Sequence, residues 1–281
     1  MPELPEVETV RRGLNRVTLH QPIRGGDVLL ARTIAYPESA DDFLAALQAT
    51  EIEGWQRRGK YLLAALSRQG KAAGWLGVHL RMTGQLLWLE PTEAVSSHSR
   101  VRLFVGDGRE LRFVDQRTFG RLWWVPPSAA PPEVMTGLQR LGPEPFEAEF
   151  SVAYLRSHLG RSQRPIKNAL LDQRLVAGIG NIYADEALFI SGIRPTVRCD
   201  RIGPRRASRL HSAIRKVLID SIEAGGTTFS DFRDVHGING NYGGVAWVYD
   251  RAGEPCRTCQ TPIQRLKLAG RSAHYCPQCQ R

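Results

Sequence analysis

The residues with the clearest chemical potential are Pro2, Glu3 and Glu6, at the start of the chain. Removal of Met1, which is expected before a side chain as small as that of proline, leaves Pro2 with a free secondary amine. An α-amino group titrates near pH ~8, so much of it is neutral and nucleophilic in a cell. An amine with a carboxyl group within a turn can form a Schiff base with a sugar aldehyde carbon. The same residues also fit an ordinary helix start, in which proline and acidic side chains are favoured.

Four of the five cysteines form two Cys-x2-Cys pairs near the end of the chain, Cys256 with Cys259 and Cys276 with Cys279. The stretch between the pairs has the length of a β-hairpin that would bring them together. Four thiolates in tetrahedral geometry suit Zn²⁺, and such a closed site is structural because no position is open to a substrate. Two disulfides or free thiols are the alternative. Cys199 stands apart and is predicted to be a small, partly buried hydrophobe.

A glycine-rich segment at 178–183, Gly-Ile-Gly-Asn-Ile-Tyr, precedes a stretch predicted to be helical. Glycines let the backbone approach an anion, and the amides that open the next helix point at it, so this segment fits a phosphate site. Lys167 supplies a candidate second charge for the same phosphate. Tight packing between helices explains the glycines about as well.

Three side chains at predicted strand ends could enter a DNA duplex: Met82, Arg117 and Phe119. Arg117 and Phe119 would point the same way if the backbone between them stays extended. An arginine with two apolar side chains can unstack a base step and replace an extruded nucleotide, so we call these three the wedge residues. Core or rim positions are the alternative for the two apolar ones.

Lys60 opens a predicted strand after Arg57, Arg58 and Gly59. A lysine close to arginines can have a lowered pKa that suits proton transfer, although a solvated basic face is the alternative. Basic side chains also fall on the predicted zinc hairpin, where phosphate contact is natural. They are Arg257, Arg265, Lys267 and Arg271.

The composition points to a folded protein with a polyanionic partner. The 281 residues carry a formal net charge of +10 and are 42% hydrophobic, so the charge belongs to a folded surface rather than a basic tail. Nucleic acid is favoured over a membrane surface because no lipidation motif, apolar run of membrane-spanning length or signal peptide stands out. We expect two or three domains and a cytoplasmic location.

The hydrophobic pattern predicts an α+β fold. Short apolar runs dominate up to about residue 125 and favour a β-sandwich or barrel, interrupted by a helix after Pro2 and another at about 41–47. Four prolines within 125–132 predict a linker without regular structure. A period of about 3.6 follows, as in Leu210, Ile214, Val217 and Ser221, whose helix would end at Gly225-Gly226.

Together these segments resemble the family of formamidopyrimidine-DNA glycosylase and endonuclease VIII. The match runs the whole chain in order. The residues that carry it are Pro-Glu-Leu-Pro-Glu-Val-Glu at 2–8, His-Leu-Arg-Met-Thr-Gly at 79–84, Asp-Gln-Arg-Thr-Phe-Gly at 115–120, Gly-Pro-Glu-Pro at 142–145, Leu-Asp-Gln at 171–173, Gly-Ile-Gly-Asn-Ile-Tyr at 178–183, Gly-Gly-Thr-Thr at 225–228 and the terminal zinc ribbon.

The resemblance implies a two-lobed fold with DNA in the cleft between the lobes. It implies a catalytic β-sandwich at 1–125, a linker at 126–133, a helix–two-turns–helix domain at 134–225, and a lesion-capping loop with a zinc hairpin at 226–281. The capping loop itself would run from about Arg233 to Gly244.

The resemblance also implies catalytic roles. Pro2 would attack C1′ of the damaged nucleotide, and Glu3 would donate and shuttle protons as the sugar ring opens. Lys60 would donate a proton in β-elimination, Arg271 would serve δ-elimination and phosphate binding, and Glu6 matches an acidic residue that the family has near the lesion.

The remaining carried-over residues would contact DNA. The wedge residues match the triad that fills the gap left by a flipped base. Those that fall where the family contacts phosphates are His98, Lys167, Asn181, Tyr183 and, in place of a lysine-rich run of some relatives, Arg164. Thr118 replaces a basic residue that many relatives carry after the wedge arginine.

The function implied is excision of oxidised purines from duplex DNA by a monomer with one structural Zn²⁺, followed by β,δ-elimination at the abasic site. Leu4 and the segment 115–120 favour this branch over the endonuclease VIII branch, which prefers oxidised pyrimidines. A zinc-ribbon DNA-binding protein without catalysis is the alternative of another class, and the N-terminus is the feature that does not fit it.

Overall fold

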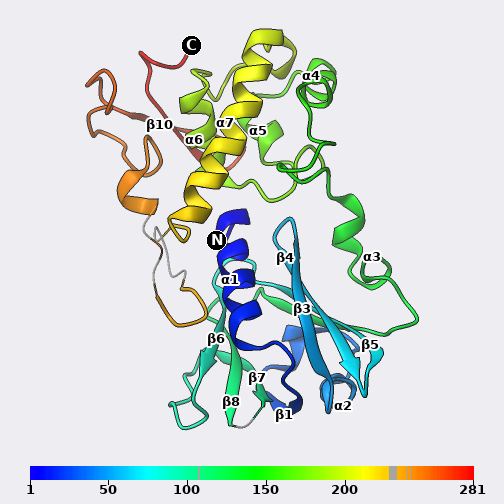
Figure 1. Cartoon of the computed structure of the whole chain (residues 1–281). Helices are drawn as coiled ribbons and strands as arrows, with labels where there is room; N and C mark the ends of the chain where they lie inside the picture. Colours follow the sequence, from blue (N-terminus) through cyan, green and yellow to red (C-terminus); the bar gives the residue numbers. More distant parts are fainter. Residues whose placement is uncertain (107, 228–232, 239, 241) are drawn as a thin grey trace. The chain divides into compact units, whose positions relative to one another are not determined.

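The strands predicted before residue 125 are confirmed, and they form the two sheets of an N-terminal β-sandwich (Figure 1). One sheet has the order β1-β7-β8-β6 and the other the order β2-β9-β5-β4-β3. A computed structural model describes all residues except 107, 228–232, 239 and 241. The strand bounds are β1 Ile23–Val28, β2 Ile34–Tyr36, β3 Glu51–Arg58, β4 Tyr61–Arg68, β5 Lys71–His79, β6 Gly84–Leu89, β7 Ser99–Val105, β8 Arg109–Asp115 and β9 Arg121–Val125.

The core of the sandwich follows the alternation of the sequence. In β7 the side chains of Val101, Leu103 and Val105 are buried, while their neighbours on the strand are not. β7 and β8 form the expected antiparallel hairpin, although Asp107 of its turn lies outside the described residues. Buried side chains of both sheets make one apolar cluster.

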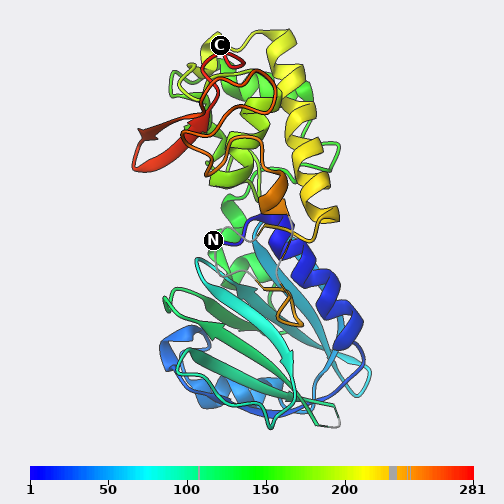
Figure 2. The same ribbon diagram turned by 90° about the vertical axis from the view of Figure 1, so that its left-hand side faces the viewer.

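Two helices accompany the sheets, as predicted. In α1 (Leu4–Val17) the side chains of Val7, Val10 and Leu14 are buried in the core of the sandwich. α1 lies alongside β3 (Figures 1 and 2). Helix α2 (Ala40–Leu47) starts where the hydroxyl of Ser39 accepts a hydrogen bond from the Asp42 N–H. A short 3-10 turn, η1 (Ala31–Thr33), precedes β2.

The proline-rich segment contains more regular structure than predicted. Helix α3 (Pro131–Val134) begins within it, followed by the 3-10 turn η2 (Thr136–Arg140). Prolines suit the first turn of a helix because the amide they lack has no partner there, so this part of the prediction is wrong.

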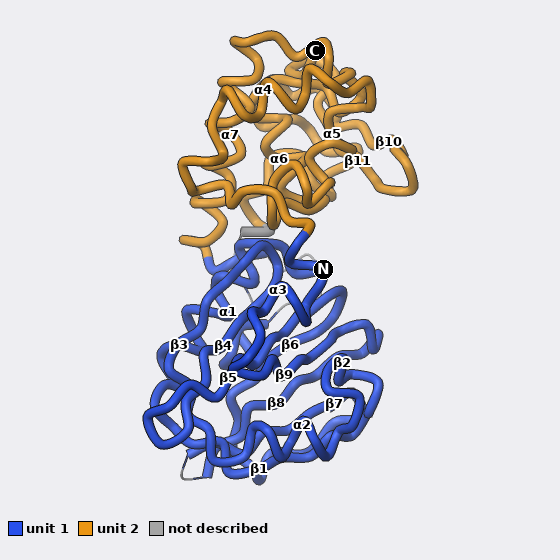
Figure 3. The backbone as a smooth tube through the Cα atoms, turned by 90° about the vertical axis from the view of Figure 1, so that its right-hand side faces the viewer, with its two compact units in different colours: residues 1–139, 225–240 blue, residues 140–224, 241–281 orange. Residues whose placement is uncertain are grey.

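The rest of the helices belong to a second unit, coloured orange in Figure 3. The first unit comprises residues 1–139 and 225–240, and the second comprises residues 140–224 and 241–281. The elements of the second unit are α4 Val152–Gly160, α5 Ile166–Leu170, α6 Asn181–Ile190, η3 Cys199–Arg201, α7 Pro204–Glu223, η4 Tyr242–Val245, β10 Gln264–Leu268 and β11 Arg271–Tyr275.

Helix α7 confirms the predicted face and end. Leu210, Ile214, Val217 and Ser221 are buried. The two glycines that follow its C-cap have φ values of 77° and 86°, in the left-handed region that favours glycine.

After α7 the chain returns to the first unit through residues 225–240. Val235 of this segment is 1% exposed and belongs to the apolar cluster of the sandwich. Its carbonyl accepts a hydrogen bond of 2.8 Å from the Trp88 N–H. None of the helices described is both long enough and apolar enough to cross a bilayer.

Candidate functional site

The N-terminal residues with catalytic potential are enclosed at the start of α1. Pro2 is buried, and Glu3 and Glu6 are 2% and 1% exposed. Glu6 Oε2 accepts a hydrogen bond of 2.8 Å from the Glu3 N–H. Its other oxygen accepts from the N–H and the hydroxyl of Thr227, at 2.8 and 3.0 Å. Glu6 therefore ties the first helical turn to the segment that follows α7.

Lys60 lies in the turn between β3 and β4 and is 7% exposed. The preceding Gly59 has a φ of 56°, a conformation that costs glycine little. Arg57 Nη1 donates to the Gly59 carbonyl at 3.1 Å, and Arg57 Nε contacts Glu8 of α1 at 3.3 Å. The turn that carries Lys60 is thus bonded to the helix that Pro2 and Glu3 directly precede.

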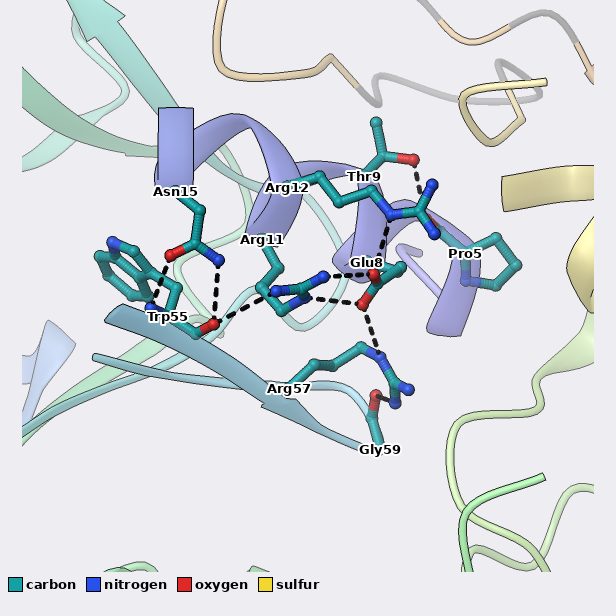
Figure 4. Close-up of polar contacts among 9 residues, drawn as sticks. All are labelled: Pro5, Glu8, Thr9, Arg11, Arg12, Asn15, Trp55, Arg57 and Gly59. Carbon is teal, nitrogen blue, oxygen red and sulfur yellow. Dashed lines mark hydrogen bonds and ion pairs between the residues drawn. The ribbon is translucent and has the colours of Figure 1, made fainter. Parts of the chain in front are cut away.

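Glu8 is the centre of these contacts (Figure 4). Its carboxylate also accepts hydrogen bonds from Arg11, at 2.7 and 2.9 Å, and from Arg12, at 2.9 Å. Burial raises the pKa of Glu8, but the hydrogen bonds and charges of Arg11, Arg12 and Arg57 outweigh burial and hold this pKa below its usual range. Glu8 is therefore ionised at neutral pH.

About two turns beyond Glu8 along α1, Asn15 continues the contact with β3. Its amide donates to the Trp55 carbonyl at 3.1 Å, and its carbonyl accepts from the Trp55 N–H at 2.8 Å. Figure 4 shows Asn15 and Glu8 facing the same strand. The side of α1 toward β3 is thus fixed at two levels.

His79 is a candidate that the sequence prediction did not assign. It pairs with Tyr61 across β4 and β5, and the two rings meet edge to face at 4.4 Å. Burial, with the charges of Arg81 and Lys60, lowers the pKa of His79 to about 3, so the ring is neutral. Its Nδ1 accepts from the Arg81 N–H at 3.0 Å, which leaves Nε2–H as the donor of the ring. The sequence signal that could have identified His79 is its position in the segment 79–84, which also contains Met82.

The wedge residues lie on two loops of the sandwich. Met82, in the turn between β5 and β6, is partly exposed, and Phe119, between β8 and β9, is 49% exposed. The backbone at 117–119 is not extended as expected, because Thr118 has a φ of 58°. The Arg117 guanidinium instead lies over the Phe119 ring, 5.1 Å from its centre. His98 is exposed at the start of the neighbouring strand β7.

The side chains of Lys167 and Tyr183, two of the predicted phosphate contacts, are buried within the second unit. Lys167 Nζ is fully buried, bonds Asp185 Oδ1 at 2.6 Å and donates to the Ser272 carbonyl. The Tyr183 hydroxyl is hydrogen-bonded to that of Ser221. Both side chains thus have partners inside the unit, and their contact with phosphate stays a prediction.

The other predicted contacts of the second unit stay near its surface. Asn181, the first residue of α6, donates from its amide to the Ser272 hydroxyl at 3.2 Å. Arg164 is exposed and pairs with Asp172 at 3.0 Å. Arg271 is exposed directly after the hairpin turn Ala269-Gly270, whose two positive φ values fit a two-residue β-turn.

The four paired cysteines form a compact metal-ligand cluster. The antiparallel β10–β11 hairpin brings the two pairs together, and the ligand sulfurs all lie within 4.8 Å of one another. The Thr258 and Cys279 N–H groups point at Cys256 and Cys276 sulfurs at 3.4 Å, as donors that stabilise thiolates. No disulfide joins any of the five cysteines, so the disulfide alternative is wrong. The donor set fits one structural Zn²⁺.

The predicted capping loop, Arg233–Gly244, is described except for residues 239 and 241. Asp234 Oδ1 accepts from the His236 and Ile238 N–H groups, both at 2.9 Å, and the Ile238 side chain is 62% exposed. Beyond the loop, the buried carboxylate of Glu186 accepts from three successive N–H groups, those of residues 247–249, at 2.8 to 2.9 Å. Burial raises the pKa of Glu186 despite these hydrogen bonds.

The predicted site residues thus fall into three groups. Pro2, Glu3, Glu6 and Lys60 gather around the start of α1, and the wedge residues with His98 gather at the loops of the sandwich. The remaining residues belong to the second unit, where Arg271 and the zinc ligands share one hairpin.

Comparison with family models gives three matches along the chain. Residues 1–122 match the formamidopyrimidine-DNA glycosylase N-terminal domain, and residues 141–233 match the formamidopyrimidine-DNA glycosylase H2TH domain. Residues 253–281 match a zinc finger found in FPG and IleRS.

Similar proteins cover the whole chain. A formamidopyrimidine-DNA glycosylase of Synechococcus is 65% identical over 100% of this chain and 99% of its own, and one of Nostoc punctiforme is 63% identical over 100% and 96%. Among solved structures, MutM (Fpg) of Thermus thermophilus has a TM-score of 0.87 and 39% identity over 99% of this chain and 98% of its own. The Lactococcus lactis Fpg bound to DNA with an abasic site has a TM-score of 0.90 and 31% identity over 99% of each chain.

Proposed function

The chain belongs to the formamidopyrimidine-DNA glycosylase family, whose members are DNA glycosylases and abasic-site lyases, and we propose that it excises oxidised purines from duplex DNA through the amine of Pro2. Its substrates are 8-oxoguanine, formamidopyrimidines and abasic sites, and it works as a monomer. Related structures hold DNA with an abasic site, with carbocyclic 8-oxoguanine and with a formamidopyrimidine lesion, which supports this substrate class.

The observation that carries the proposal is the enclosed N-terminal cluster. Buried Pro2 directly precedes Glu3, whose N–H donates to the Glu6 carboxylate, and the turn of Lys60 is bonded to α1 through Glu8 and Arg57. A capping box accounts for Glu3 and Glu6 at this helix start, but it accounts neither for the burial of Pro2 nor for the Lys60 turn bonded to the same helix. The arrangement supports amine catalysis rather than helix capping alone.

The chemistry follows from the amine. The Pro2 nitrogen forms a bond to C1′ as the bond to the base breaks, and Glu3 supplies the proton that opens the sugar ring. The resulting imine withdraws electrons, so a C2′ proton is lost and the C3′–O bond breaks with its electron pair on the phosphate. Lys60 assists this β-elimination, and Arg271 assists the second elimination that releases the C5′ phosphate.

Binding depends on groups away from the bond-breaking centre. We assign the wedge residues to the space left by the flipped nucleotide, and Glu6 to the surroundings of the lesion. Exposed His98 and Arg164, partly exposed Asn181, and Lys167, Tyr183 and His79 with their buried side chains are assigned to phosphates. Zn²⁺ on the four paired cysteines holds the hairpin that presents Arg271 and takes no part in catalysis.

We propose the functional division expected from the sequence: a catalytic part at 1–125, a linker at 126–133, a helix–two-turns–helix part at 134–225 and a capping-loop and zinc-hairpin part at 226–281. The three separate family matches support this division. Because the substrate is chromosomal DNA, we place the enzyme at the nucleoid in the cytoplasm.

Borohydride trapping tests the proposal. The protein is incubated with an 8-oxoguanine:C duplex and, separately, with a thymine-glycol:A duplex. We expect a covalent adduct and faster excision with the first duplex. Preference for the second would assign the chain to oxidised pyrimidines, and the absence of any adduct, with the Pro2 amine shown by mass to be uncovered, would support a non-catalytic DNA-binding protein.

A further inference from the structure

We propose that the carboxylate of Asp115 is a positioning residue that joins the two loops of the wedge residues into one rigid unit. Its role is to set Met82, Arg117 and Phe119 in register for entry into the duplex, so the inference rests on the proposed function. Asp115 ends β8 and is 1% exposed. Because it is buried, it acts through the two loops rather than on DNA itself.

Each oxygen of Asp115 binds a different loop. Oδ1 accepts from the Thr83 hydroxyl, which directly follows Met82 in the turn between β5 and β6. Oδ2 accepts at 2.7 Å from the N–H of Gly120, which directly follows Phe119 in the loop between β8 and β9. One buried carboxylate therefore fixes the backbone beside two of the wedge residues.

Thr83 extends the connection to the third wedge residue. Its hydroxyl donates to Asp115 and accepts from the Arg117 N–H at 3.0 Å. The Asp115 backbone in turn donates to the His98 carbonyl at 2.9 Å and accepts from Arg100 Nε at 2.8 Å. The backbone of His98, the predicted phosphate contact directly before β7, is thus held by the same residue as the wedge loops.

The two loops need such an anchor because their backbone is strained. Arg81 and Thr118 have φ values of 55° and 58°, and a β-branched residue such as Thr118 rarely adopts the left-handed region. Strained conformations of this kind persist only where the surroundings enforce them. Gly120 also allows no side chain, because a Cβ there would collide with the Phe113 ring.

The geometry requires two acceptor oxygens. In Asp115→Asn the amide nitrogen must face either the Gly120 N–H, a second donor, or the Thr83 hydroxyl, which would then lose the acceptor of its own proton. In Thr83→Val the bridge to Arg117 is lost with little change of volume. Thr83→Ser retains the hydroxyl and is the rescue variant.

The test compares two single-turnover rates: base excision from an 8-oxoguanine:C duplex and strand scission of a duplex with a preformed abasic site. Excision needs a stacked, paired base to be extruded, whereas the abasic substrate has no base to extrude. We expect Asp115→Asn and Thr83→Val to lower excision about tenfold or more and abasic-site scission by less than about threefold. A 2-aminopurine beside the lesion should gain less fluorescence on binding, and Thr83→Ser should behave as the parent.

Glu110→Gln is the matched control. Glu110 lies on the same strand, is fully buried and binds Arg102 and Arg112 away from both loops. It should lower thermal stability without changing the ratio of the two rates. If Asp115→Asn and Thr83→Val keep the parent ratio, as Glu110→Gln does, the inference is wrong and Asp115 only stabilises the sandwich. Failure of the parent protein itself to form the borohydride adduct would overturn the proposed function instead.

Discussion

Glu6 and Thr227, which are 221 residues apart in the sequence, are joined by two hydrogen bonds to one carboxylate oxygen. The other oxygen of Glu6 binds the Glu3 N–H. Glu6 therefore links the start of α1 to the segment after α7 by using both of its carboxylate oxygens as acceptors. The conformation of the N-terminal cluster and that of the segment leading to the capping loop are coupled at this residue.

Glu6→Gln should damage both stability and lesion excision. The amide nitrogen would face either the Glu3 N–H or the Thr227 N–H, and such a buried donor–donor contact costs about 1–3 kcal/mol. Thermal unfolding measures the first effect and single-turnover excision the second. Thr227→Ser, which keeps both donors, is the control and should match the parent; a loss of activity there would show that the Thr227 methyl group matters instead.

Pro2→Gly should retain DNA binding and lose most strand scission, by about a hundredfold or more, because the secondary amine is the nucleophile. Nicking assays and binding titrations on the same abasic duplex measure the two properties. Mass determination of the intact N-terminus comes first, since retention of Met1 would cover the amine. Normal turnover by the variant would contradict the assignment.

Glu8→Gln should slow β-elimination by about threefold to tenfold, because the turn of Lys60 loses its charged anchor on α1. Arg12→Gln is the matched control: its guanidinium also contacts Glu8 but is half exposed, so the expected change is below about twofold. Rates are measured on a preformed abasic site. Equal losses in the two variants would show that the whole cluster, rather than Glu8, holds the turn.

The neutral imidazole of His79 should make stability depend on pH. Its pKa is about 3 in the folded protein and 6.5 in an ordinary histidine. Between these values the unfolded chain binds a proton that the folded chain does not, so stability is complete above about pH 6.5 and falls as the pH decreases, by up to about 1.4 kcal/mol per unit. Urea unfolding at pH 7 and pH 5 measures this slope.

His79→Gln should reduce that slope. His20→Gln, at an exposed position, is the control variant. Identical slopes in the parent and in both variants would mean that other groups set the acid sensitivity.

Removal of zinc should unfold the β10–β11 hairpin and weaken DNA affinity by about tenfold or more, because binding of the metal is coupled to local folding. Circular dichroism and DNA titrations before and after chelation measure the two effects, and added Zn²⁺ should restore both. The affinity of the intact protein should also fall steeply with salt, since phosphate contacts dominate. Unchanged binding after verified zinc loss would remove the hairpin from the interface.

The sequence alone predicted those parts of the fold that depend on local pattern. The buried stripe of Val7, Val10 and Leu14, the alternation in β7 and the spacing of the cysteine pairs each determine an element directly. The exception is α3. Proline is excluded from the interior of a helix, but here prolines occupy the first turn.

Contacts between distant segments could not be predicted. Glu8 and Arg57 are 49 residues apart, and Lys167 and Ser272 are 105 apart, so neither pattern nor spacing reveals that they meet. For the same reason Lys167 could be recognised as a conspicuous basic residue but not as a buried one. His79 and Asp115 were within recognised segments, yet their burial depends on the packing of whole strands.

The position of Val235 limits where the chain can be divided into fragments. It completes the apolar interior of the sandwich from a position far beyond the strands, and a Cβ on Gly13 would lie 2.6 Å from one of its methyl groups. A fragment that ends at residue 139 would lack Val235. The loss would leave a cavity in the apolar core and the Trp88 N–H without its acceptor. The sandwich therefore cannot be separated from the chain after residue 139. Exchanging it between relatives requires the segment 225–240 as well.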